Sequence, residues 1–354
     1  MKIPGAAVYL AKRAGVLMLT VVVAVYLTIL VANMGGYVDE IVKGELLFEV
    51  STSLRQNPAF RGLNETAFNQ LVMEVFNQRV RELGLDQPFF VRSLIYLRDA
   101  ITLDLGRALF LTSDSGSRSV RLIILERLPS TILLFTTVQM LIFAIGLVGG
   151  LYLSRRYGTK TDRTFSYLAT LSAIPGWFYG IFLILVFASW LRVLPYGGMV
   201  DIPPPEDRFL YALSVLKHMI LPIMSWLVAF SFFSIYSRRT FFLIYSSEDF
   251  VEVAKAKGIP EHLVRRRYVL RPTLPPIITD FSLTLVASWT GAIITETVFN
   301  WPGTGRLFYE AAHIFDTPVL VGLVVIYAYL VVITVFILDL VYALVDPRIR
   351  AGLR

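Results

Sequence analysis

Three acidic residues lie in or at the ends of long apolar runs: Asp280, Glu296 and Asp339. A charged side chain at the centre of a bilayer costs about 3 kcal/mol, so the depth of each acid decides what it can do. Asp280 falls in a first helical turn, where the helix dipole favours an acid, and Asp339 is close enough to Asp346 to reach an interface. Glu296, just before Trp301, is the best placed to face a water-filled pathway. The alternative is that all three are solvated or capped at helix ends.

Trp289 is a further pathway candidate, because it falls mid-helix beside small and polar residues, although lipid or helix packing is the alternative. The three histidines do not gather on one predicted side of a membrane, so we expect no shared metal site. The chain has no cysteine, which excludes disulfides and thiolate chemistry. It also has no GxxxxGK[ST], GxSxG or HExxH motif, so no nucleotide-binding or hydrolytic site of those kinds is expected.

The longest polar interruption in the second half of the chain is residues 246–276. Ser246 is predicted to cap a short helix, with Asp249 three residues on in a capping-box arrangement. Gly258 is placed as a left-handed C-cap and Pro260 begins a second helix that carries several arginines. One mostly apolar stripe at helical spacing comprises Phe250, Val253, Ala254 and Lys257. A short, well-capped helix in a basic loop predicts a contact surface.

The elements around this loop are long apolar segments, since 56% of the residues are hydrophobic and only 17% are charged. Pro129 is expected in a first helical turn, and Pro175 is expected to kink a span. We predict an all-α membrane protein in which the first span is retained and not cleaved. The six predicted spans are 14–33, 128–153, 165–191, 218–237, 277–298 and 318–345.

Residues 34–120 form a polar insertion between the first two spans. Amphipathic helices are predicted over 64–83, ended by Gly84, and over 88–103. Their expected buried faces are Phe68, Leu71, Val72, Val75 and Phe76 in the first, and Phe90, Leu94, Leu97 and Ile101 in the second. This insertion is therefore predicted to be structured.

The charges are asymmetric across the predicted membrane. The side that holds both termini and the 238–276 loop carries 18 Lys and Arg against 6 acids, whereas the other side carries 15 against 17. Cytoplasmic loops attract the positive excess, so both termini and this loop are expected in the cytoplasm. The net charge of +7 is thus mostly a topology signal. A nucleic-acid surface would need a clustered basic face with base-reading groups, and none is evident.

Several segments together resemble one family, the membrane permease subunits of dipeptide/oligopeptide-type ABC importers. The stretch DFVEVAKAKGIPEHLVRRRYVLRPTLPPIITD is similar to that family's EAA loop, with Val253 in place of the first alanine. The other similar segments are LGLDQPFFVRSLIYLRDAITLDLG, RLPST, HMILP and ETVFNWPGTGRL. The resemblance implies a type I importer fold with a tail and first span at 1–33, the 34–120 insertion, a transmembrane domain at 121–346 and a cytoplasmic tail at 347–354.

The resemblance also implies a non-catalytic subunit of a prokaryotic cell membrane. Its expected partners are a second homologous permease, two cytoplasmic ATPase subunits that bind ATP and Mg, and an extracytoplasmic substrate-binding protein. Cofactors of its own are not expected, and peptides are the implied substrate, with oligosaccharides or a nickel complex as alternatives. The implied contacts of the coupling helix with an ATPase are Asp249, Phe250, Glu252, Val253, Ala254, Ala256, Lys257 and Gly258.

Three other interpretations of the residues remain. The helix near residue 250 could rest on anionic lipid headgroups, helped by the nearby arginines. An ion-driven secondary transporter would show matching halves and midplane charges, and no convincing repeat is present. An intramembrane enzyme would need a nucleophile–base or metal constellation, which is not visible.

Overall fold

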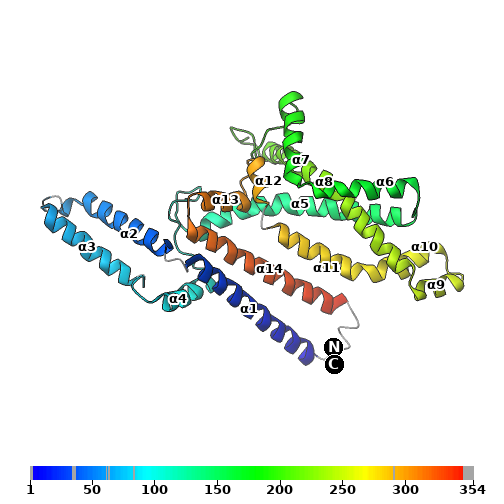
Figure 1. The fold of residues 1–354 in the computed structure, drawn as a ribbon, viewed down its shortest axis with the longest axis horizontal. Coiled ribbons are helices and arrows are strands. Elements are labelled where there is room, and N and C mark those ends of the chain that lie inside the picture. Colours follow the sequence, from blue (N-terminus) through cyan, green and yellow to red (C-terminus); the bar gives the residue numbers. More distant parts are fainter. Residues whose placement is uncertain are drawn as a thin grey trace. The chain divides into compact units, whose positions relative to one another are not determined.

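A computed structural model describes residues 3–33, 37–60, 62, 64–82, 84–289 and 292–345 of the chain. These residues are mainly helical and contain no strand, apart from an isolated bridge between Arg107 and Ser119 (Figure 1). The helices of the first part are α1 (Ile3–Asn33), α2 (Tyr37–Gln56), η1 (Pro58–Phe60), α3 (Glu65–Glu82), α4 (Phe89–Ile101) and α5 (Val120–Ser154). Next come α6 (Lys160–Leu168), η2 (Ala169–Ala173), α7 (Gly176–Leu183), η3 (Ile184–Trp190) and α8 (Arg208–Ser246). The last are α9 (Asp249–Ala256), α10 (Glu261–Leu263), η4 (Val264–Leu270), α11 (Arg271–Ser288), α12 (Ile293–Val298), α13 (Thr304–His313) and α14 (Thr317–Val345).

Four helices of the described chain are long and apolar enough to cross a membrane: Ala11–Val31, Val120–Ser154, Arg208–Ser246 and Thr317–Leu340. A fifth span results if the bent pair formed by Lys160–Ala173 and Gly176–Trp190 counts as one. The all-α membrane class is confirmed, while six spans remain a prediction. The segment expected to be the fifth of those six is divided between α11 and α12.

Proline marks two departures from the expected spans. The predicted kink at Pro175 is present, but it is a 92° bend, far sharper than a gentle kink. Pro129 is not in a first helical turn, because α5 begins nine residues earlier and encloses it. Neighbouring helices and local adjustments can satisfy the backbone groups that a proline frees inside a membrane helix.

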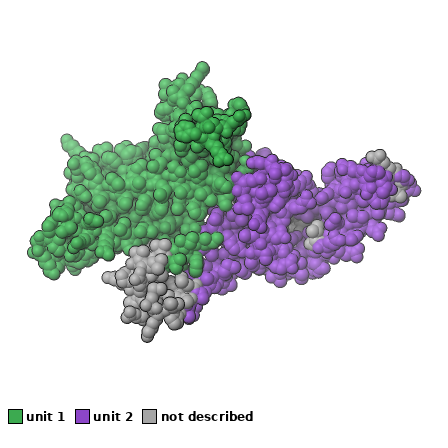
Figure 2. All heavy atoms as spheres, turned by 180° about the vertical axis from the view of Figure 1, so that it is seen from behind, with its two compact units in different colours: residues 1–6, 127–309, 333–354 green, residues 7–126, 310–332 purple. Residues whose placement is uncertain are grey.

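The chain divides into two compact units, which Figure 2 shows in different colours. Residues 1–6, 127–309 and 333–354 form unit 1, and residues 7–126 and 310–332 form unit 2. In unit 2, the apolar face of α1 packs against α4 and the first half of α14, around Val25, Ile29 and Val325. The buried carboxylate of Asp316 accepts hydrogen bonds from the backbone N–H groups of residues 109–111, which fixes the loop before α5.

The amphipathic helices predicted in the insertion are present as α3 and α4. The face expected on α3 is buried or half-buried, and Gly84 follows with the left-handed φ of 66°. The face expected on α4 is wrong in its first turns, since Phe90 and Leu94 are exposed while Arg92 and Ser93 are buried. The Arg92 guanidinium lies inside because it donates to the carbonyl oxygen of Leu85 at 3.1 Å. Helix α2 was not expected.

Unit 1 is built on a close approach between α5 and α8. A Cβ atom added to Gly150 would lie 2.5 Å from the Cβ of Arg238 and 2.9 Å from the backbone nitrogen of Arg239. Gly146 and Gly149 are similarly tight against Ser234 and Ile235. Small residues let two membrane helices approach this closely, so these three glycines set the spacing between α5 and α8, the helix that precedes α9.

Candidate functional site

Helix α9 rests on an apolar base at the end of α8. Val251 and Ala254 are 1% and 2% exposed and pack with Phe242, Val264 and Ile277. These partners come from α8, η4 and α11, so three elements support one face of an eight-residue helix. An isolated helix of that length would be marginal in water, and its orientation therefore depends on this packing.

The ends of α9 are only partly as predicted. Gly258 is confirmed as the left-handed residue, with φ of 71°, and its N–H donates to the carbonyl of Lys255 at 2.8 Å. The predicted N-cap is wrong, because Ser246 is the last residue of α8 and its hydroxyl donates to the carbonyl of Phe242. Glu248 takes the N-cap position without a side-chain cap bond.

The opposite face of α9 is open. Phe250 and Val253 are 42% and 52% exposed, and Glu252 pairs with Lys255 at 3.0 Å on the same surface. The other exposed residues predicted at this contact are Asp249, Ala256, Lys257 and Gly258. Ala254 is the exception, because it belongs to the buried base. Val251, which the sequence reasoning missed, joins it there; its spacing of three from Ala254 was the available signal.

Glu296 lies inside a closed polar cluster in unit 1 and has no exposed surface. Its carboxylate accepts a hydrogen bond from the Thr131 hydroxyl at 2.8 Å and one from the backbone N–H of Arg306 at 2.9 Å. The Thr131 hydroxyl oxygen in turn accepts from the backbone N–H of Thr304 at 2.7 Å. The carboxylate therefore ties α12 to α5 and to the first turn of α13, and in this conformation it faces no open pathway.

Two glycines make room for this carboxylate. A Cβ on Gly303 would come within 2.4 Å of the Glu296 carboxyl group, and one on Gly305 within 3.1 Å. Next to the cluster, the fully buried Trp301 donates from Nε1 to the carbonyl of Ser130 at 3.0 Å. The segments 127–131 and 296–307, far apart in sequence, thus form one interlocked structure.

The other three pathway candidates do not meet at one place. Trp289 follows the last residue of α11, is half-buried and donates from Nε1 to the Thr136 hydroxyl at 3.0 Å. Asp280 is 64% exposed and bonds the Arg238 guanidinium at 2.7 Å. Asp339 is half-buried within α14. Trp289 is thus bonded to α5 and Asp280 to α8, and a pathway role for the three residues stays a proposal.

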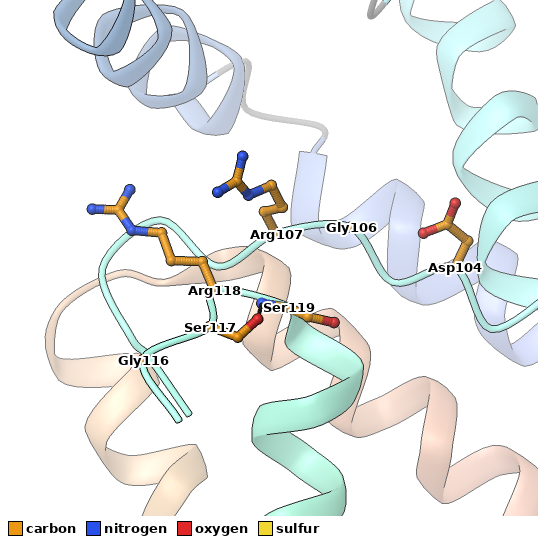
Figure 3. A pocket seen from close by; sticks show the side chains of 7 residues that line it. All are labelled: Asp104, Gly106, Arg107, Gly116, Ser117, Arg118 and Ser119. Carbon is orange, nitrogen blue, oxygen red and sulfur yellow. Dashed lines mark hydrogen bonds between the residues drawn. The ribbon is translucent and has the colours of Figure 1, made fainter. Parts of the chain in front are cut away.

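Unit 2 has a separate surface pocket of about 560 Å³ along the loop 104–119. Figure 3 shows Arg107 and Arg118 extending to the same side of this loop. Both are already paired with α2, Arg118 with Glu45 at 3.1 Å and Arg107 with Glu49 at 4.0 Å. Within the described ranges, no three His, Cys, Asp or Glu side chains gather as a metal site would require.

Among known protein families, residues 146–351 match the one described as "Binding-protein-dependent transport system inner membrane component". This match covers more than half of the chain. The chain belongs to this family. The matched range includes α9, its base and the part of the Glu296 cluster that lies on α12 and α13, and it supports the resemblance drawn from the sequence.

Relatives of this inner membrane component are similar over most of their length. The oligopeptide transport system permease protein AppB of Bacillus subtilis is 31% identical over 274 residues, which are 77% of this chain and 84% of that one. The dipeptide transport system permease protein DppB of Alkalihalophilus pseudofirmus is 29% identical over 86% of this chain and 93% of its own. The di/tripeptide transport system permease protein DppB of Pseudomonas aeruginosa is 28% identical over 77% and 84%.

Proposed function

We propose that this inner membrane component is the permease subunit of an ATP-driven ABC importer for di- and oligopeptides. An extracytoplasmic binding protein delivers the substrate, and a second, similar permease completes the pathway. Two cytoplasmic ATPase subunits bind ATP and Mg and supply the energy, while this chain catalyses no reaction. The names of the relatives support peptides as the substrate class.

The exposed face of α9 carries the proposal. Its inner face is held by a buried apolar base, so a force applied to the outer face moves the whole helix and the ends of α8 and α11 with it. Phe250 and Val253 offer apolar contact area for an ATPase groove, and Asp249 and Glu252 offer acceptors for its polar groups. Gly258 provides the turn from α9 into the next helix. Both termini and this helix are cytoplasmic in the proposed orientation, which agrees with the basic excess of that side.

We expect Phe250→Asp and Val253→Asp to release the ATPase subunits. Phe250 and Val253 supply the apolar area of this face, and burying an unpaired carboxylate in their place costs about 2 kcal/mol or more, a loss of about thirtyfold in affinity. The measurement is co-purification of the ATPase subunits with the tagged full transporter, together with ATP-dependent uptake of labelled peptides into proteoliposomes.

The matched control is Phe90→Asp on α4, where an equally large aromatic is 71% exposed. It should leave both co-purification and uptake as in the wild type. If Phe250→Asp and Val253→Asp retain the ATPase subunits at wild-type ratio, α9 is not the docking helix. Uptake that survives ATP depletion and collapses with an uncoupler would instead identify an ion-driven transporter, and uptake of sugars or a nickel complex would correct the substrate class.

A further inference from the structure

Two adjacent arginines near the end of α8 each hold a carboxylate from a different helix. Arg239 donates two hydrogen bonds to the Asp162 carboxylate of α6. Its Nε lies 2.8 Å from Oδ1, and its Nη2 donates to Oδ2. Arg238 bonds Asp280 of α11 at 2.7 Å. The end of α8 is thereby joined to both helices by charged hydrogen bonds.

The pair formed by Arg239 and Asp162 is buried. The two side chains are 11% and 3% exposed, and the same carboxylate accepts the backbone N–H of Gly158 at 3.0 Å. The Arg239 guanidinium also lies over the ring of Tyr157, 4.9 Å from its centre. An unpaired buried charge has a high free-energy cost. Separating Arg239 from Asp162 is therefore unfavourable, and the pair keeps its geometry.

The pair formed by Arg238 and Asp280 is weaker. Arg238 is 13% exposed but Asp280 is 64% exposed, so solvent competes for the carboxylate and the pair contributes less than a fully buried one. The two adjacent arginines therefore provide an internal comparison, since they occupy the same turn of α8 but differ in the burial of their partners.

The position of this turn relates it to α9. A Cβ added to Gly150 of α5 would lie within 3.0 Å of backbone atoms of both arginines, so this turn is closely packed against α5. Phe242, less than one turn further along α8, is fully buried in the base that holds Val251 and Ala254 of α9. A displacement of α9 therefore reaches Arg239 through continuous helix and close packing.

We propose that Arg239 and Asp162 are positioning residues that transmit the movement of α9 to the bent helix pair α6 and α7. The inference rests on the proposed function, because it takes α9 as the helix that an ATPase moves. Asp162 lies in the first turn of α6, so its ion pair with Arg239 connects α8 directly to the first end of the bent pair. Without this ion pair, α9 and α8 would move and α6 would not follow them.

The test uses the complete transporter in proteoliposomes and measures peptide uptake per ATP hydrolysed. We expect Arg239→Ala to keep the ATPase subunits bound but to lower uptake per ATP by about tenfold, which is within the range for residues that carry coupling between sites. Arg239→Lys keeps the charge but loses one of the two hydrogen bonds, so uptake per ATP is expected to fall about threefold. Arg238→Ala, the matched control, should change uptake per ATP by less than twofold, because the carboxylate that it releases is already open to water.

The ratio of uptake to hydrolysis separates coupling from simple loss of protein, because both quantities fall together when less transporter assembles. Uptake per ATP at the wild-type value in Arg239→Ala would overturn the inference. If Arg239→Ala fails to assemble, Arg239→Lys decides in the same way. Failure of the wild-type chain to co-purify with ATPase subunits would refute the proposed function itself, and the two failures are therefore distinguishable.

Discussion

Replacing Glu296 with alanine is expected to prevent the transporter from accumulating in a folded state. The substitution leaves the Thr131 hydroxyl and the backbone N–H of Arg306 without their acceptor in a place that has no access to water. Each unsatisfied buried group costs about 1–3 kcal/mol, and the empty volume adds to this. The total of about 4 kcal/mol is a large part of the stability of a typical domain.

The measurement is the midpoint of heat-induced aggregation of the detergent-solubilised transporter, followed by size-exclusion chromatography. Glu296→Gln is expected to fall between alanine and the wild type, because one amide oxygen still accepts while the NH₂ group faces a donor. The control is Glu82→Ala, an acid of α3 whose side chain is 49% exposed. An aggregation midpoint for Glu296→Ala equal to that of Glu82→Ala would show that the cluster does not contribute to stability.

Replacing Gly150 with leucine is expected to separate α5 from α8. The added Cβ meets the backbone of α8 at the two arginines, and backbone cannot rotate away as a flexible side chain can. Overpacking of a close contact typically costs about 1–3 kcal/mol and more when backbone must move. We expect a clear fall in the thermal midpoint and the loss of peptide uptake.

Ala144→Leu on the same helix is the matched control, since residue 144 is exposed and its added atoms meet open surroundings. It should leave the aggregation midpoint and uptake near the wild-type values. Gly150→Leu with the same midpoint and uptake as Ala144→Leu would mean that α5 and α8 do not need the close approach seen here.

Local signals were read correctly from the sequence where one residue decides the backbone. Gly258 has the predicted left-handed conformation, and the chain bends at Pro175 where a kink is predicted, although more sharply. The stripe on α9 was less predictable, because apolar residues occur on both of its faces and only the contact with Phe242 decides which face is inside. Ser246 failed as a cap because α8 runs up to it, so its hydroxyl was already used within the longer helix.

Glu296 could not be placed from its neighbours in the sequence. Its position near the end of an apolar segment suggested solvation, but its hydroxyl partner, Thr131, is 165 residues away. The glycines at 303 and 305 were a partial signal, because the absence of side chains there leaves space for the Glu296 carboxylate. The ion pair of Arg239 with Asp162 could not be predicted for the same reason, because the two residues are 77 positions apart and both lie in basic surroundings.

The 92° bend at Pro175 limits what can surround this part of the molecule. Where the bent pair crosses a membrane as one span, carbonyl groups freed at the bend need hydrogen-bond donors that lipid tails cannot supply. The carbonyl of Leu171 is one of them, and it accepts hydrogen bonds from the Tyr179 hydroxyl at 2.8 Å and from the backbone N–H of Ile174 at 3.1 Å. The bend therefore belongs against protein or water and away from bulk lipid, and α8 of the same chain already packs against both arms of the bend.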